Sequence, residues 1–185
     1  MNSNNVSSLV VLCCILATLA VVLACGISTN DLADTDSITH DKEYLGQGVK
    51  FPEQVYSPHI NVGQKHPPYN SKPATSGWHY PNLVKWGVYE IEIPDEYLLH
   101  NLEHGGVGIH YNCLQECLGM LDELSRIASQ YDKIVVSPYS DMDSRISLTS
   151  WTYKDSFDEF NEDRITAFIN AHIGKPPAPE YSVPP

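Results

Sequence analysis

The stretch VGIHYNCLQECLGMLDELSRIASQYDKIVVS, residues 107–137, decides the fold that we expect for this chain. Val107–Tyr111 and Lys133–Ser137 are short runs with β-branched residues, which are typical of strands. Between them, apolar residues recur every three or four positions, as on the buried face of a helix. These residues are Leu114, Cys117, Leu118, Leu121, Leu124 and Ile127. Strand, helix and strand in this order predict one right-handed crossover.

More regular structure is expected on the N-terminal side of this crossover. In residues 87–93 every second side chain from position 89 is apolar, which predicts a half-buried strand. Asp95 can cap a short helix that runs through His104. The pair Gly105-Gly106 would end that helix, because glycine tolerates the left-handed conformation found just after helix ends.

On the C-terminal side, residues 146–153 predict another strand. The pattern Ser156-x-x-Glu159 is typical of a capping box and predicts the start of a last helix. The expected fold class is therefore α+β. We expect a small mixed sheet with a short histidine-bearing helix, one crossover helix and a C-terminal helix. A long irregular Pro-rich segment, residues 49–80, is expected to precede them.

Composition divides the chain into four regions. Residues 1–27 are expected to be a signal peptide or an N-terminal membrane anchor, and residues 28–48 a polar, acidic tether. Residues 49–175 are expected to form a single globular domain, since a domain usually takes about 100–200 residues. Residues 176–185 are expected to be an extended tail, because two prolines end the last helix.

The leader is an apolar run from Ser8 to Ile27 that is long enough to span a bilayer as a helix. Three outcomes stay open: a lipid on Cys25 after a lipoprotein-like box, an uncleaved signal anchor, or cleavage near residues 24–28. Acidic residues follow the run, so no positive cluster holds the downstream side in the cytoplasm. We therefore expect a domain on the extracellular or periplasmic face, anchored to the membrane through the N-terminal segment or secreted.

The charge and the cysteines of the chain indicate which partners and which cysteine chemistry to expect. The chain has 11 Lys and Arg residues against 23 Asp and Glu residues, which gives a formal net charge of −12. Phosphate binding needs clustered basic residues, whereas those of this chain are scattered singly, so we expect no nucleic-acid partner. The sequence does not indicate a protein partner. Cys113 and Cys117 are expected to form a disulfide in an oxidising compartment.

Residues 100–104, HNLEH, carry the most chemical information in the chain. On a helix, His100 and His104 share one face with their Cβ atoms about 5–6 Å apart, so both can bind one metal ion. The string also matches H-x-x-E-H, the inverted zinc-peptidase motif. In that mechanism the histidines bind Zn²⁺ and the glutamate, here Glu103, is the general base for a bound water.

Other residues could complete the metal site. His79 is the candidate third ligand, and Met142 would add a thioether, which together with imidazoles suits copper. His59 and His66 lie in the same irregular segment as His79 and could be further ligands or outer contacts. We therefore expect a transition-metal ion, with copper slightly preferred over zinc.

Three alternatives to metal handling stay open. The first is a zinc-dependent hydrolase that uses Glu103 as its base. The second is a non-enzymatic extracellular binding module with an aromatic recognition surface. The third is a packing role for His100 and His104 at the helix end, since a motif match is only a hypothesis. The aromatic residues concerned are Tyr69, Trp78, Tyr80, Trp86 and Tyr89.

Three ordered motifs carry a family resemblance: PATSGWH at 73–79, LHNLEHGGV at 99–107 and ISLTSW at 146–151. Together they resemble the signature of the family called domain of unknown function 3105. The resemblance implies that His79, His100, Glu103 and His104 belong to one pattern, consistent with one site. It also implies a signal or a single membrane span before the domain. It implies no settled activity, because the family has none.

Overall fold

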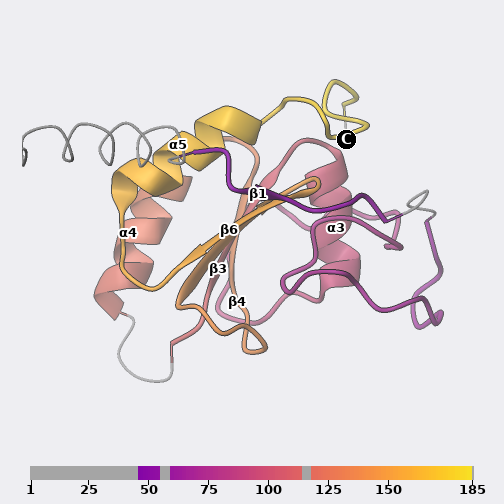
Figure 1. Ribbon diagram of the computed structural model, residues 1–185, viewed down its shortest axis with the longest axis horizontal. Coiled ribbons are helices and arrows are strands. Elements are labelled where there is room, and N and C mark those ends of the chain that lie inside the picture. The colour runs from indigo at the N-terminus through magenta and orange to yellow at the C-terminus, as the bar shows by residue number, and fades with distance from the viewer. Residues whose placement is uncertain (1–45, 55–58, 114–117, 185) are drawn as a thin grey trace, which may run out of the picture. The chain divides into compact units, whose positions relative to one another are not determined.

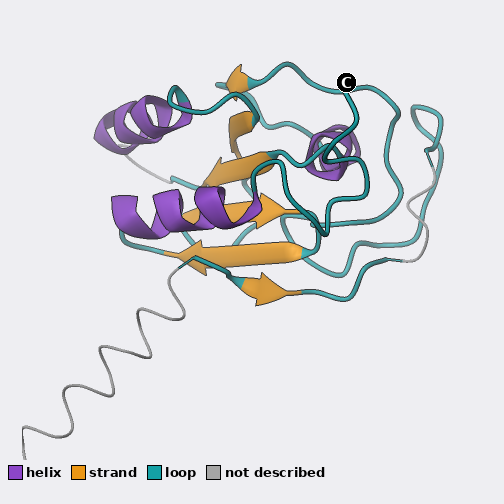
Figure 2. Cartoon of the chain, turned by 90° about the horizontal axis from the view of Figure 1, so that it is seen from above, coloured by secondary structure: helices purple, strands orange, loops and turns teal. Residues whose placement is uncertain are grey.

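The computed structural model of the protein describes residues 46–54, 59–113 and 118–184. Within these residues, six strands form one mixed sheet and three helices pack on it, so the predicted α+β class is confirmed (Figures 1 and 2). The predicted leader and nearly all of the predicted tether lie outside the described residues. Among the described helices, none combines the length and the apolar character that crossing a membrane requires.

The sheet order is β1-β6-β5-β3-β4-β2. Neighbours β3, β4 and β2 are parallel, and the remaining pairs are antiparallel. The elements are β1 Val49–Lys50, β2 Gly87–Val88, α3 Asp95–Glu103, β3 Val107–Tyr111, α4 Leu118–Ala128, β4 Ile134–Pro138, β5 Ile146–Ser150, β6 Tyr153–Phe157 and α5 Glu162–His172. The crossover predicted from residues 107–137 is confirmed as β3-α4-β4.

The two faces of the sheet have different chemistry. Alternate residues of β3, β4 and β5 form the main apolar core with α4 and α5, among them Ile109, Val136 and Leu148. The intervening residues of the same strands are also buried, but many are small or polar, such as His110 and Thr149. On this second face, Leu98 of α3 packs with Val135 of β4. Figure 1 accordingly shows α4 and α5 on one side and α3 on the other.

The half-buried strand predicted over residues 87–93 is wrong beyond its first two positions. Only Gly87 and Val88 pair with β4 in register, and one further bond runs from the Tyr89 N–H to the Val136 carbonyl. Beyond that point the chain leaves the sheet edge, and the side chain of Ile91 is exposed. Alternation of apolar residues shows which side chains could be buried, but it does not supply a pairing partner.

The predicted capping box at Ser156 is also wrong. The segment read as one strand plus a helix start is a hairpin, β5 and β6, and Ser156 lies in β6 with its hydroxyl 2.9 Å from that of Ser147. Helix α5 begins at Glu162 instead, where Asn161 accepts a 2.9 Å bond from the backbone N–H of Arg164. The hairpin turn at residues 151–152 contains neither Gly nor Pro, so no turn signal is visible there in the sequence.

Helix α3 ends as its two glycines predict. The Gly105 N–H donates to the Leu102 carbonyl at 2.9 Å, and the Gly106 N–H donates to the Asn101 carbonyl at 2.8 Å. This pair of bonds is the Schellman arrangement, and Gly105 takes the required left-handed backbone with φ +75°. Gly106 is needed for space, because a Cβ there would lie 2.6 Å from the Trp86 ring and 2.7 Å from the Asn101 carbonyl oxygen.

The start of α3 differs from the prediction. Asp95 makes no side-chain cap; its carboxylate accepts bonds from the Ala74 N–H at 3.2 Å and the Tyr139 hydroxyl at 2.9 Å. Burial raises the pKa of Asp95 to about 6, although these two bonds oppose the rise. The carboxylate therefore connects α3 to the Pro-rich segment and to the end of β4.

Two histidines outside the predicted site are structural. His110 is fully buried on β3, with Nε2 2.9 Å from the Thr149 hydroxyl, and burial lowers its pKa to about 3. His172 lies at the end of α5, where the helix dipole alone would favour a charged imidazole. Its ring is instead buried with Nε2 3.0 Å from the Gln47 carbonyl, and burial lowers its pKa.

We predict that His110 makes the fold acid-sensitive. Its pKa is about 3 in the folded state and 6.5 in the unfolded state, so only the unfolded state gains its proton between these values. The free energy of unfolding should therefore decrease below pH 6.5, by about 1.4 kcal/mol per pH unit for one such group. Denaturant melts of the metal-free wild type and of metal-free His110→Gln should be measured at pH 4–8. The difference between their free energies of unfolding should shrink as the pH falls. A difference independent of pH would contradict this.

We also predict that Gly106→Ala destabilises the protein by about 1–3 kcal/mol, the usual cost of overpacking. The added methyl must displace the Trp86 ring or the backbone of α3. The matched control is Gly119→Ala in α4, where an added Cβ meets nothing within 4 Å. This control should be neutral or stabilising by up to about 1 kcal/mol. Equal melting temperatures for both variants would show that Gly106 has no steric role.

Candidate metal centre

Helix α3 presents one polar face between two apolar ones. Leu99 and Leu102 are fully buried and pack with Trp151 and Ala178, while Leu98 faces the sheet. These contacts fix the rotation of the helix about its axis. His100 and Glu103, three residues apart, then lie on the remaining face, where both are at least nine-tenths buried as side chains.

The Pro-rich segment brings two further histidines to this face. His59 and His79 form an isolated parallel bridge, in which the Ile60 N–H donates to the His79 carbonyl at 2.8 Å. The next residue, Tyr80, donates its N–H to the Glu96 carbonyl of α3, also at 2.8 Å. Backbone bonds on both sides therefore hold His79 against the helix.

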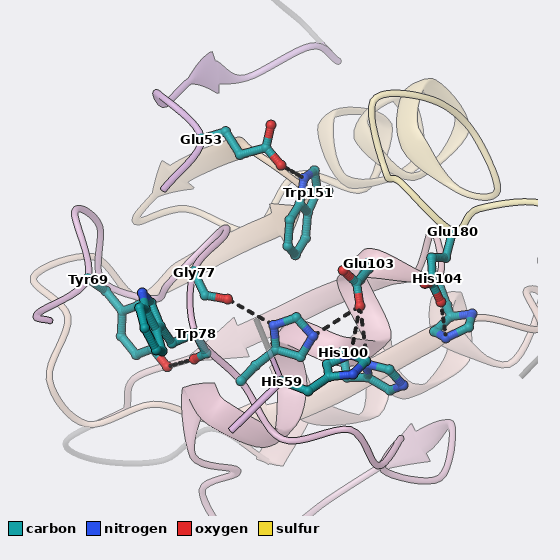
Figure 3. Close-up of polar contacts among 11 residues, drawn as sticks. Glu53, His59, Tyr69, Gly77, Trp78, His100, Glu103, His104, Trp151 and Glu180 are labelled. Carbon is teal, nitrogen blue, oxygen red and sulfur yellow. Dashed lines mark hydrogen bonds and ion pairs between the residues drawn. The ribbon is translucent and has the colours of Figure 1, made fainter. Parts of the chain in front are cut away.

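Three imidazoles converge on one oxygen atom of Glu103, and the contacts of His59 and His100 can be followed in Figure 3. Glu103 Oε2 lies 3.0 Å from His79 Nε2 and 3.3 Å from His100 Nδ1. The third contact, at 3.4 Å, is with Nε2 of His59. One ligand atom from each of the four residues lies within 4.8 Å of every other. Ligands about 2.0–2.1 Å from a tetrahedral ion are about 3.3 Å apart, so the three measured contacts match the spacing around such an ion.

The ring of His79 is oriented for a ligand. Its Nδ1 lies 2.8 Å from the Gly77 carbonyl oxygen, which can only accept, so Nδ1 carries the hydrogen. In a neutral ring, Nε2 then turns its lone pair toward the Glu103 carboxylate, and two acceptors face each other across 3.0 Å. Such an arrangement needs a cation, either a proton on Nε2 or a metal ion. Metal-binding histidines usually donate their second N–H to a carbonyl in this way.

His100 provides an independent sign of a ligand. Its Nδ1 is buried and has no hydrogen-bond partner, although it lies within ion-pair distance of Glu103. A buried polar atom without a hydrogen bond is costly, and such atoms are rare in native folds. An ion between the ring and the carboxylate would satisfy it.

The carboxylate of Glu103 is ionised in this environment. Burial alone would raise its pKa, but the contacts with His100, His79 and His59 outweigh burial and hold the pKa well below the usual range. Three imidazole nitrogens and one carboxylate oxygen are donors that suit a transition metal. The residues present therefore fit a metal ion, and the same donor types are accepted by several metals.

His104 is outside this cluster, although its spacing from His100 predicts a shared ion. Its Nε2 lies 3.2 Å from Glu180 Oε2, and its Nδ1 lies 3.3 Å from the Val183 carbonyl oxygen. Figure 3 shows the ring turned toward Glu180 and away from Glu103. The Glu180 N–H also donates to the Glu103 carbonyl at 3.0 Å, so this part of the tail, predicted to be extended, packs on the end of α3.

The remaining candidate ligands also lie elsewhere. His66 Nε2 contacts Glu96 at 3.2 Å. Met142 is buried, and its carbonyl accepts a 2.8 Å bond from the side chain of Asn112. In the described part of the chain no hydrogen bond joins either residue to the cluster. Asn101, which lies between the two histidines of the motif, bonds both backbone groups of Val84.

Other sequence predictions concern residues around the cluster. Cys113 is disulfide-bonded, whereas Cys117, its predicted partner, lies outside the described residues. The aromatic side chains considered as a recognition surface make internal contacts. The Tyr69 hydroxyl donates to the Trp78 carbonyl at 2.6 Å, and the Tyr80 ring packs edge-on against that of Tyr97.

Comparison with known proteins supports the family resemblance and adds no function. The family model described as "Protein of unknown function (DUF3105)" matches residues 59–185, which include all four residues of the cluster. No curated protein and no solved structure matches the chain. The match covers more than half of the sequence, so the chain belongs to the domain of unknown function 3105 family.

Proposed function

We propose that this protein binds one divalent transition-metal ion through His59, His79, His100 and Glu103. The observation that supports this most directly is the position of Glu103 Oε2, 3.0–3.4 Å from one ring nitrogen of each histidine. A buried carboxylate surrounded by three imidazoles has the donor set and the spacing of a metal site. These four residues form the His₃Glu cluster.

A purely structural ion pair would explain the cluster less well. It would need a proton on His79 Nε2, and it would pair the buried His100 Nδ1 with Glu103 Oε2 at 3.3 Å without hydrogen-bond geometry. One metal ion would satisfy both nitrogens and the carboxylate at once. The Gly77 carbonyl, which fixes the His79 ring, would then be the outer contact that orients a ligand.

Zinc is the best match to these donors, and copper is second. The sequence-based preference for copper depended on the thioether of Met142, and this side chain is not in the cluster. Imidazole and carboxylate ligands without sulfur suit zinc, which has no strong geometric preference of its own. Copper(II) would still bind well in vitro, because it leads the affinity series of divalent ions.

The geometry favours metal binding over hydrolysis by the H-x-x-E-H mechanism. In that mechanism the glutamate is not a ligand and activates a water on the ion. Here Glu103 Oε2 is in contact with all three imidazoles, so it occupies a ligand position. His104, the second histidine of the motif, contacts Glu180 instead.

The sequence supports a location outside the cytoplasm for this function. The apolar run at residues 8–27 and the acidic residues after it are typical of export. We propose that the N-terminal segment holds the domain at the outer face of a membrane. The net charge of −12 argues against nucleic acid as a partner and favours approach of cations.

We predict that the full-length protein, purified in mild detergent and stripped of metal, takes up close to one equivalent of Zn²⁺. At a free concentration 100 times the dissociation constant, binding should add about 2.7 kcal/mol of stability. For a domain of this size the melting temperature should rise by about 5–10 °C. Metal analysis after gel filtration and melting curves with Zn²⁺, Cu²⁺ or Mg²⁺ measure this. A melting temperature that changes with neither Zn²⁺ nor Cu²⁺ would refute the proposal.

His100 of α3 and His104, the residue that caps the end of this helix, provide a matched pair of variants. His100→Ala should weaken Zn²⁺ binding by more than about 100-fold, above the effect of losing an outer contact. His104→Ala removes an equally buried imidazole from the end of the same helix but should retain the ion, since His104 lies outside the cluster. Competition with a fluorescent zinc indicator gives both affinities. Loss of binding in both variants would support the H-x-x-E-H assignment instead, since both histidines are ligands in it.

A further inference from the structure

The four residues of the His₃Glu cluster differ sharply in exposure. The side chains of His79, His100 and Glu103 are 0%, 9% and 9% exposed, whereas that of His59 is 43% exposed. An ion held by the cluster would therefore have three ligands inside the protein and one ligand facing solvent. This asymmetry bears on how an ion enters and leaves.

His59 is also the least constrained member. Its contact with Glu103 Oε2, at 3.4 Å, is the longest of the three imidazole contacts. In the described part of the chain its Nδ1 has no hydrogen-bond partner, whereas Nδ1 of His79 contacts the Gly77 carbonyl at 2.8 Å. Its ring lies edge-on to the rings of His79 and His100, with centroids 5.0 and 4.9 Å away. The ring thus covers the other ligands without being fixed by a second polar contact.

The other three residues hold their positions without any contact from the His59 ring. His100 and Glu103 are on one helix, whose buried leucines fix its rotation. His79 is fixed by backbone bonds and by its own Gly77 contact. If the His59 ring swings toward solvent, two imidazoles and one carboxylate still face one point, which is the ligand number of an open zinc site.

We propose that His59 is an exchangeable ligand, and that the cluster gives up or accepts its ion by direct transfer to a molecule with nitrogen ligands that approaches from the His59 side. This inference rests on the proposed metal binding. In the first step of the transfer, a lone pair of the incoming nitrogen would form a bond to the ion, and the bond between the ion and His59 Nε2 would break. Further donor atoms of the same molecule would then replace His79, His100 and Glu103. The imidazole keeps its electron pair, and the charge of the ion does not change. Zinc tolerates the five-coordinate state that this requires.

The experiment follows zinc transfer to the chromogenic chelator 4-(2-pyridylazo)resorcinol by stopped-flow absorbance, with the full-length protein loaded with one equivalent of Zn²⁺. Direct transfer predicts a rate that rises in proportion to chelator concentration. His59→Ala should still carry zinc and should release it at least about tenfold faster, because one ligand and its cover are lost. His79→Ala should fail to retain zinc through gel filtration.

His66→Ala is the matched control, because His66 lies on the same segment but contacts Glu96 instead of the cluster. It should transfer zinc at the wild-type rate. A wild-type rate independent of chelator concentration, or a His59→Ala rate within twofold of wild type, would overturn the inference. Loss of zinc from His59→Ala as complete as from His79→Ala would also overturn it. If wild type itself binds no zinc, the proposed function fails instead. If His59→Ala lowers the metal-free melting temperature, the transfer rate of His59→Asn is compared with that of wild type instead.

Discussion

The buried carboxylate of Glu103 is the group on which the rest of the site depends. An anion removed from water is costly unless opposite charge and hydrogen bonds replace the lost solvent. Here the replacement comes from three imidazoles that belong to two separate parts of the chain. In its described residues the Pro-rich segment has little regular structure, and the contacts of His59 and His79 with Glu103 are among the side-chain contacts that fix its course. Without them, this segment would leave a negative charge buried against the helix.

The helix that carries the carboxylate is fixed at both ends and on its apolar faces. At its start, Asp95 accepts bonds from the Ala74 N–H and the Tyr139 hydroxyl. At its end, the Glu180 N–H donates to the Glu103 carbonyl, and the Lys133 ammonium donates to the carbonyl of His104. These contacts fix the backbone on both sides of the residues that face the Pro-rich segment. The C-terminal tail is therefore part of the support of the site, although it supplies none of its ligands.

The sequence predicted much of this arrangement, and its failures have identifiable physical causes. The crossover and the end of α3 followed from local patterns, because apolar periodicity and glycine conformation act within a few residues. His79 and His100 were paired from motifs far apart in the chain, and the structure brings them together. The assignment of His104 as a ligand could not be checked against a second motif. On a helix with 3.6 residues per turn, Glu103 lies about 60° from His100 and His104 about 40°, so spacing alone favours neither. The tail decided the outcome, since Glu180 and Val183 engage the ring of His104.

The exposure of His59 links the two chemical roles considered for this fold. A structural zinc site is closed by four protein ligands, and a catalytic one leaves a position for water. With His59 bound, the cluster would supply four ligands and exclude water from the ion. With His59 displaced, the ion would keep three ligands and gain an open position on the solvent side. Glu103 would still be one of those ligands, so it could not also act as the base for a bound water. Displacement of His59 therefore leads more readily to ligand exchange than to the hydrolysis of the H-x-x-E-H mechanism, and the difference lies in the one oxygen atom on which the imidazoles converge.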